Sequence, residues 1–429
     1  MSDSQSNKLW QSIQNAGGVN EYVTKQLSEN GFLVKRRETD NMSKRELTNY
    51  KKELKEESAE RKRLKQEAWK VYQSKHIVHL GEGIYWTDDN ANDKWDLPEA
   101  EERAAENELP PLDSPKQLAD ALGMSVADLR WFSYHRDAAK KIHYNRFVIP
   151  KSNGTERAIW APMPKLKEAQ RWILTNIVER LIVHGNAHGF LPGRSILSNA
   201  KVHTDSKIIL KMDLKDFFPT VTVSRVKGVF RKAGYREQVA TLLAHLCTEA
   251  PREIVEHNGD KYFIALGPRC LPQGAPTSPG LTNTLCLRLD RRLDGLARKY
   301  GWRYSRYADD LTFSLPTSHK DPPKLGSLIG LISRIVTEEG FQVHPDKTRV
   351  SRTGGSQRVT GLQVNGKAPP RIPRQLKREM RAALHNLKSG KPLAEGESLE
   401  SIQGYLAYIT MVEPDLGRKM LEEFNAISI

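Results

Sequence analysis

Two aspartates, Asp309 and Asp310, stand side by side in the stretch RYADDLTFS, residues 306–314, within a run that otherwise favours β-strands. Neighbouring like charges repel each other, and a strand that passes through a sheet gains nothing from holding them. We therefore expect the chain to turn back here. The pattern predicts a hairpin with both carboxylates at its tip, and a function that needs them there.

A third carboxylate, Asp213, ends the apolar run KIILKMD, which reads as a short buried strand. A buried charge without a partner costs several kcal/mol, so a carboxylate at a strand end needs one. Asp213, Asp309 and Asp310 could share that need by binding Mg²⁺, which prefers oxygen ligands and also takes substrate phosphates. Two such ions about 4 Å apart would stabilise an in-line phosphoryl displacement. For any one aspartate at a strand end, a turn cap is the simpler interpretation.

The charge distribution indicates a polyanionic partner. The formal net charge is +15, although residues 82–113 contain eleven acidic and only two basic residues. That segment carries −9, which leaves +24 on the rest of the chain. Such an excess is typical of nucleic-acid-binding proteins, and a merely soluble basic surface is the alternative.

Cysteine usage and hydropathy indicate a cytoplasmic protein with no membrane partner. The three cysteines form no CxxC pair, which argues against a disulfide framework or a cysteine zinc site. The N-terminus, MSDSQSNKLW, lacks the basic and apolar regions of a signal peptide. No run approaches the ~18 consecutive apolar residues of a membrane helix.

Helical and strand periods alternate along most of the chain. Ser43 and Glu46 form a capping-box signature before a charged helix that continues to Tyr72. Short helices are expected around Val19 to Leu27, and the acidic segment reads as a linker or a draped loop. The further expected elements are helices at 114–122, 125–133, 166–183, 224–233, 236–249, 278–300, 374–388 and 399–411, a hairpin at 144–160 and a strand at 207–214.

Three ordered motifs carry a resemblance to reverse transcriptases. RYADDLTFS resembles their YxDD hairpin, LKMDLKDFFPTVT their first aspartate motif, and LPQGAPTSPGLTN the motif that follows it. A lone YADD is weak, whereas three motifs in order within about a hundred residues are strong. Further matches extend the resemblance from Tyr144 to about Val412: FVIPKSNGTERAIWAPMPKLKEAQRWI, AHGFLPGRSI, GFQVHPDKTRV and RVTGLQVNG.

Within that family the chain resembles the reverse transcriptases of bacterial retrons. SNAKVHT contains Asn199, Ala200 and His203 of an NAxxH motif, and Val359, Thr360 and Gly361 match a VTG motif. The resemblance implies an α+β right-hand polymerase with fingers, a palm built on an antiparallel sheet, a helical thumb and a mostly helical N-terminal extension. The implied divisions are the extension at 1–113, N-terminal helices and fingers at 114–206, the palm at 207–365 and the thumb at 366–429.

The resemblance also implies roles for particular residues. Asp213, Asp309 and Asp310 would be the catalytic carboxylates that hold two Mg²⁺ ions. The implied nucleotide-binding residues are Lys151 and Arg157 for the triphosphate, Gln273 and Gly274 beside nucleotide and template, Phe218 as the sugar gate, and Lys347 as a proton donor to pyrophosphate. The alternatives are a solvated hairpin tip for the two basic residues, a plain surface lysine at 347, and Phe217 in place of Phe218.

The retron motifs would choose the template. The implied RNA-binding residues are Asn199, Ala200, His203, Val359, Thr360 and Gly361; for NAxxH the alternative is one helical turn of packing. The basic helix at 374–388 would follow duplex phosphates in the thumb. Residues 35–70 carry a net charge of +5. The apolar stripe of the helix expected from Ser43 to Tyr72 is too narrow for a core. We therefore expect this helix to lean on the polymerase or on RNA and to clamp RNA or DNA product.

The implied activity is RNA-directed DNA synthesis from deoxynucleoside triphosphates. The enzyme would copy part of a cognate non-coding RNA from an RNA 2′-OH, making branched multicopy single-stranded DNA used in defence against phage. An effector or toxin protein would be a further partner. One alternative is another prokaryotic reverse transcriptase, of the phage-exclusion or intron-derived type. Another is a scaffold that holds RNA–DNA and restrains a toxic partner.

Overall fold

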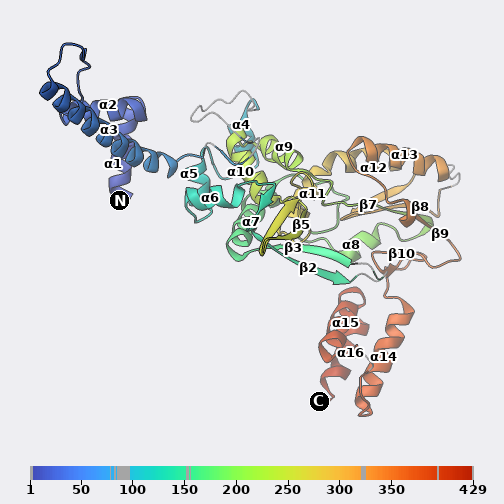
Figure 1. Cartoon of the computed structure of the whole chain (residues 1–429). Helices are drawn as coiled ribbons and strands as arrows, with labels where there is room; N and C mark the ends of the chain where they lie inside the picture. Colours follow the sequence, from blue (N-terminus) through green and yellow to red (C-terminus); the bar gives the residue numbers. More distant parts are fainter. Residues whose placement is uncertain are drawn as a thin grey trace.

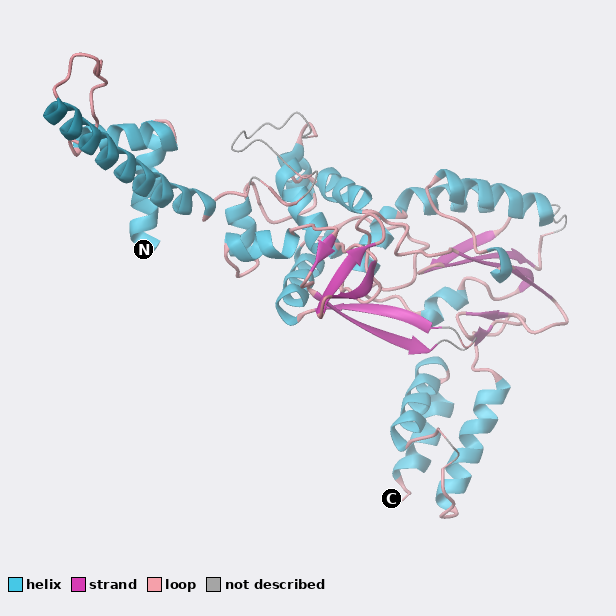
Figure 2. Cartoon of the chain, viewed as in Figure 1, coloured by secondary structure: helices cyan, strands magenta, loops and turns pink. Residues whose placement is uncertain are grey.

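The computed structural model describes residues 3–77, 79–81, 84, 97–150, 154, 156–319, 325–393 and 396–427. Strands gather in the middle of the molecule, and purely helical parts lie at both ends of the chain (Figure 2). A three-helix N-terminal module and a three-helix thumb project from this centre in different directions (Figure 1). The right-hand α+β architecture is confirmed. No described helix is both long and apolar enough to cross a membrane.

An antiparallel sheet of four strands, in the order β7-β8-β4-β9, forms the palm. Its strands are β4 (Ser206–Asp213), β7 (Arg303–Tyr307), β8 (Asp310–Pro316) and β9 (Arg349–Arg352). Leu210 and Met212 of β4 join the main core, while Ile209, directly before Leu210, joins the core of the thumb. Successive residues point to opposite faces and both faces are covered, which explains why apolar residues at 208, 209, 210 and 212 do not alternate with polar ones.

Helices and two small sheets surround the palm. The helices are α5 (Pro115–Ala121), α6 (Val126–Ser133), α7 (Pro164–Asn176), α9 (Val223–Ala233), α10 (Glu237–Cys247), α11 (Thr277–Leu285), α12 (Leu287–Lys299) and α13 (Leu325–Glu338). The fingers hairpin pairs β2 (Tyr144–Pro150) with β3 (Glu156–Pro162), as predicted. The remaining sheet holds β1 (Ala138–Ala139), β6 (Asp260–Ala265) and β5 (Arg252–His257).

The thumb contains α14 (Arg374–Lys388), α15 (Leu399–Val412) and α16 (Pro414–Asn425). The first two were predicted, whereas α16 was not. Met380, Leu384, Ile402 and Leu406 are buried between these helices. A small hairpin of β10 (Arg358–Val359) and β11 (Leu362–Gln363) precedes the thumb and contacts α8 (Ile196–Lys201).

The N-terminal module consists of α1 (Asp3–Ala16), α2 (Val19–Glu29) and α3 (Lys44–Gln73). The capping box of Ser43 and Glu46 is confirmed. We had expected the stripe on α3 to lean on the polymerase or on RNA, but α1 and α2 pack against this helix instead. Val23, Leu27 and Leu64 form the small core of the module.

The acidic segment contains a helix, where we had expected only a linker or a draped loop. Helix α4 (Ala100–Glu106) packs on α9, and Glu101 forms an ion pair with Arg236. Gly234, at φ 120°, allows this contact, because a Cβ there would lie 2.4 Å from the Ala100 carbonyl oxygen. The main core also includes four aliphatic side chains from the expected extension: Ile77, Leu80, Leu109 and Leu112. The extension expected at 1–113 therefore divides into a separate module and a part that belongs to the polymerase core.

Cys247, Cys270 and Cys286 are all buried and free. Burial raises the pKa of Cys247 and of Cys286 to about 12, and that of Cys270 to about 11. All three thiols therefore stay protonated at neutral pH, where a thiol is a poor nucleophile.

Candidate active site

The YADD sequence forms the turn between β7 and β8. Tyr307 and Asp310 are cross-strand partners, so the turn consists of Ala308 and Asp309. Ala308 adopts φ 54°, a left-handed conformation that a two-residue hairpin requires and that most residues avoid. The carbonyl oxygen of Asp309 accepts a hydrogen bond from the Leu214 backbone N–H at 3.0 Å. This bond ties the turn to the end of β4.

The three aspartates meet at the end of the palm sheet. Asp213 and Asp310 are direct partners across β4 and β8. Burial, and then the charge of Asp213, raise the pKa of Asp309 to about 6. Burial also raises the pKa of Asp310. Among the described residues, no basic side chain forms an ion pair with Asp309 or Asp310, so neither carboxylate has a direct cationic partner.

Lys347 forms its ion pair with Asp213. It belongs to a 3₁₀ turn, Pro345–Lys347, and its Nζ donates to the two carboxylate oxygens of Asp213 at 2.9 and 3.0 Å. Within the described residues, no group of three or more His, Cys, Asp or Glu side chains is arranged to hold a metal ion. The oxygen donors and the unbalanced charge nevertheless fit a divalent cation. Binding by all three aspartates would require Lys347 to move away from Asp213.

A buried ion pair supports the turn from below. Arg306 and Asp290 of α12 are both 0% exposed, and Arg306 Nε and Nη2 donate to the two oxygens of Asp290 at 2.8 and 2.7 Å. Arg306 Nη1 donates to the Ala308 carbonyl oxygen at 3.1 Å. Our sequence analysis missed this pair. The available signal was the position of Arg306, which shares the inward face of β7 with Tyr304.

The AHGF segment lies directly on the hairpin. The His188 N–H donates to the Arg306 carbonyl oxygen at 2.8 Å, and Asn283 donates to the Gly189 carbonyl oxygen at 2.8 Å. A Cβ at Gly189 would lie 2.7 Å from the Ala308 nitrogen. Only glycine therefore permits this approach, and the turn is held from two sides.

The two neighbouring phenylalanines occupy different environments. Phe217 is buried at 5% exposure and packs against Phe341, with ring centroids 5.6 Å apart. Phe218 is only partly buried beside it. The placement agrees with a core role for Phe217 and leaves Phe218 as the candidate sugar gate.

The predicted triphosphate and template residues lie around the fingers hairpin. Arg157 is exposed on β3, while Lys151 lies outside the described residues. The Gln273 carbonyl oxygen accepts from the Trp160 N–H at 2.7 Å. A Cβ at Gly274, φ 124°, would lie 2.8 Å from the Trp160 carbonyl oxygen. We had expected Gly274 to allow a close backbone approach to nucleotide and template. In the structure, Gly274 makes its close approach to Trp160 of the fingers hairpin.

The NAxxH side chains are buried beneath the palm. Asn199 and His203 are 0% exposed. Ser305 Oγ donates to Asn199 Oδ1 at 2.6 Å, so His203 Nε2 must donate to Ser305 at 2.7 Å and Nδ1 must accept from Ser314 at 2.8 Å. Burial lowers the pKa of His203 to about 3, which keeps the ring neutral. These contacts correspond to the packing alternative and leave no surface of these side chains for RNA.

The VTG motif packs against α8, the helix that carries Asn199 and Ala200. Val359 and Ala200 are fully buried in the thumb core, and Thr360 Oγ1 donates to the Ile196 carbonyl oxygen at 2.9 Å. Gly361 is exposed, at φ 85°. The two retron motifs therefore form one packed unit between palm and thumb. Direct RNA contact by Ala200 or Val359, which we had expected, is incompatible with their burial here.

Comparisons with known proteins give the relatives of this chain. Residues 149–371 match the family model "Reverse transcriptase (RNA-dependent DNA polymerase)". The retron Mx162 reverse transcriptase of Myxococcus xanthus is 50% identical over 97% of this chain and 88% of its own length. The Mx65 enzyme of the same organism is 44% identical over 76% and 74% of the two chains. The Ec86 enzyme of Escherichia coli is 31% identical over 73% and 89%.

Proposed function

This chain belongs to the reverse transcriptases of bacterial retrons and is an RNA-directed DNA polymerase, from which we propose that it copies part of one non-coding RNA encoded beside it. Synthesis would begin at the 2′-OH of a guanosine in that RNA, and the product would be branched multicopy single-stranded DNA. We further propose that the protein acts in the cytoplasm, in defence against phage, together with an effector or toxin protein.

The observation that carries the proposed chemistry is the convergence of Asp213, Asp309 and Asp310, with an unbalanced negative charge, at one end of the palm sheet. We assign these side chains to Mg²⁺. When bound, the metal would supply the positive charge that stabilises the attacking and leaving oxygens of phosphoryl transfer. Arg306 and Gly189 would act as positioning residues, because they hold the turn that presents Asp309.

The other side chains would bind and orient the substrates. Arg157, with Lys151, would bind the triphosphate. Phe218 would exclude a ribose 2′-OH. Lys347, once released from Asp213, carries a proton within reach of the carboxylates and would donate it to the departing pyrophosphate.

The test is the nucleic acid that accompanies the protein in cells. The chain, expressed with its neighbouring DNA, should copurify with DNA joined to RNA through a 2′–5′ branch. Sequencing before and after treatment with a debranching enzyme should place the branch at one guanosine of one RNA. The Asp309→Ala/Asp310→Ala variant should carry that RNA without DNA. Unbranched DNA, or DNA copied from many RNAs, would contradict the proposal.

A further inference from the structure

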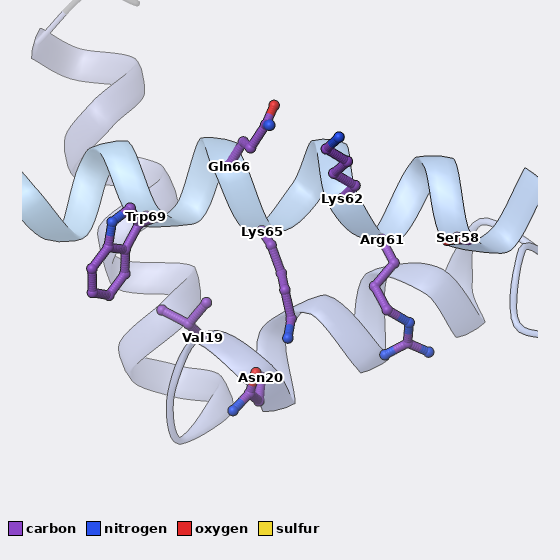
Figure 3. Close-up of a pocket in the computed structure, with 8 residues that line it drawn as sticks. All are labelled: Val19, Asn20, Ser58, Arg61, Lys62, Lys65, Gln66 and Trp69. Carbon is purple, nitrogen blue, oxygen red and sulfur yellow. The ribbon is translucent and has the colours of Figure 1, made fainter.

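An open groove of ≈ 630 Å³ lies between α2 and α3 of the N-terminal module. It is lined by Val19 and Asn20 of α2 and, from α3, by Arg61, Lys62, Lys65 and Trp69, among others. Arg61, Lys65 and Trp69 point from α3 to the same side, toward α2 (Figure 3). They follow one another at four-residue spacing, about 6 Å apart along the helix axis.

The groove is positively charged, and most of that charge is uncompensated. Lys62 and Lys65 are exposed, and neither forms an ion pair with any described residue. Arg61 contacts Glu57 at 2.7 Å, but Glu57 also pairs with Arg36 at 2.9 Å, so one carboxylate serves two guanidinium groups. The groove therefore suits a polyanion.

Trp69 adds an aromatic surface at one end of the groove. Its side chain is 46% exposed, which is unusual for so large an apolar group. The indole stacks on Tyr72, with centroids 5.3 Å apart and planes at 8°, and Tyr72 stacks on His76 at 4.5 Å. These rings hold the indole in place, and a fixed, exposed ring offers a surface on which a flat group can stack.

We propose that this groove binds a single strand of nucleic acid, with phosphates at Arg61 and Lys65, a further phosphate at Lys62 on the outer edge of the groove, and a base stacked on Trp69. Basic side chains beside an aromatic platform match both parts of a nucleotide. An acidic peptide would satisfy the charges but would leave Trp69 without a flat partner. The binding chemistry stands by itself, and only the strand's origin, as template or product, rests on the proposed function.

The test measures single-strand binding by the full chain with its polymerase cleft saturated by a generic primer–template duplex. Labelled oligodeoxythymidylate and oligouridylate serve as separate probes for DNA and RNA. Trp69→Ala should weaken binding about tenfold without changing its salt dependence, because a stacked base but no phosphate contact is lost. Trp69→Phe should restore most of the affinity.

Lys62→Ala/Lys65→Ala should weaken binding and reduce the slope of log affinity against log salt by about 1.4, since each single-strand phosphate contact contributes ~0.7. The matched control is Lys52→Ala/Lys70→Ala, which removes two exposed lysines from another face of α3. It should leave both quantities nearly unchanged. Unchanged affinity and slope in the groove variants, or equal losses in the control, would overturn the inference.

Extension of the generic duplex should be the same in every variant, which separates this test from the proposed function. Loss of the 2′–5′ branched product would not affect oligonucleotide binding, and loss of groove binding would not remove the branch. If only one probe depends on the groove, that probe identifies the strand as RNA or DNA. A protein that is captured through the groove while neither probe responds to the groove variants would also overturn the inference.

Discussion

The palm hairpin and the N-terminal module both bury a charged side chain, but they treat its partners differently. In the palm, Arg306 and Asp290 are both 0% exposed, and each is fully engaged. In the module, Glu57 is 2% exposed, while its partners Arg36 and Arg61 have 64% and 36% of their side chains exposed. The palm thus buries both charged groups of its pair, whereas in the module the two arginine partners of Glu57 remain solvent-exposed.

This difference separates a scaffold from a binding surface. Breaking a fully enclosed pair leaves a charge without water or partner, so the palm geometry is strongly enforced. Exposed guanidinium and ammonium groups can exchange partners at little cost. We therefore expect damage to the palm to remove catalysis or folding, and damage to the module to change binding alone.

The largest effect should follow from the hairpin carboxylates. Asp309→Ala/Asp310→Ala should abolish DNA synthesis, a loss on the order of 10⁴-fold, because these groups are assigned to the metal. Binding of the cognate RNA should remain nearly intact. Primer extension with Mg²⁺ measures the first quantity and filter binding the second. Surviving extension would contradict the active-site assignment.

Two deletions locate the boundary between the regions. Removing residues 1–74 should preserve extension of a generic primer–template, weaken binding of the cognate RNA and make its salt dependence shallower. Removing residues 1–113 should unfold the enzyme, because it takes Leu80, Leu109 and Leu112 from the main core, at about 2–5 kcal/mol for each. Solubility, circular dichroism and extension assays measure the difference. If the shorter deletion folds but cannot extend any primer, the module belongs to the catalytic architecture.

The two ion pairs test the comparison directly. Arg306→Leu should cost about 3–5 kcal/mol of stability, since Asp290 is left buried and unpaired. Glu57→Gln should cost about 1 kcal/mol or less, because its oxygen still accepts hydrogen bonds and its former partners are exposed. Hydrogen exchange, followed separately for palm and module amides, measures each cost where it arises. Equal costs would show that the enclosed pair and the exposed pair do not differ in their contribution to stability.

Within the palm, substitution of Phe217 should affect core packing, whereas substitution of Phe218 should affect selection between deoxy- and ribonucleotides. Phe217→Ala should destabilise the protein by about 3–5 kcal/mol, as expected for a buried aromatic ring. Phe218→Ala should cost less stability and should admit ribonucleotides during primer extension. Competition between deoxy- and ribonucleotides measures the selection. Unchanged discrimination in Phe218→Ala would place the gate elsewhere.

A smaller effect than the loss of the Arg306–Asp290 pair concerns pH. The folded pKa of Asp309, about 6, lies above its ordinary value of 3.8, so the metal-free protein should lose about 2–3 kcal/mol of stability as pH rises from 4 to 6. Asp309→Asn should remove that loss, and Mg²⁺ should stabilise the wild type more than the variant. Thermal melting against pH measures both. Glu57 should respond oppositely, because hydrogen bonds from Arg61 lower its pKa and its contribution is lost in acid.

The sequence predicted best where periodic patterns and motifs coincide. The hairpin at Asp309, the fingers hairpin and the capped helix at Ser43 each follow from local rules of charge, turn and capping chemistry. The Arg306–Asp290 pair joins residues on separate elements, so the inward position of Arg306 on β7 indicates a buried charge but does not identify its partner. Helix α4 was hidden because its acidic composition suggested a linker, although Glu101 has a basic partner on α9.

The retron motifs show a different limit. Asn199 and His203 carry polar atoms that commonly contact RNA, and a sequence does not reveal whether such atoms face solvent. In the structure, Ser305 and Ser314 contact Asn199 Oδ1 and both His203 ring nitrogens under the palm sheet. The partners lie more than a hundred residues away, and only the folded arrangement brings them together.

The burial of all three cysteines has a practical consequence for measuring motion. Since their thiols are enclosed and protonated, a maleimide or spin-label reagent should pass them by, and the natural chain behaves as if it were cysteine-free. A cysteine introduced at an exposed site, such as Lys70 of α3, would be the principal target for the reagent. Paired with a second one at an exposed position of the thumb, it would report interprobe distances while the enzyme elongates DNA, with no native residue removed first.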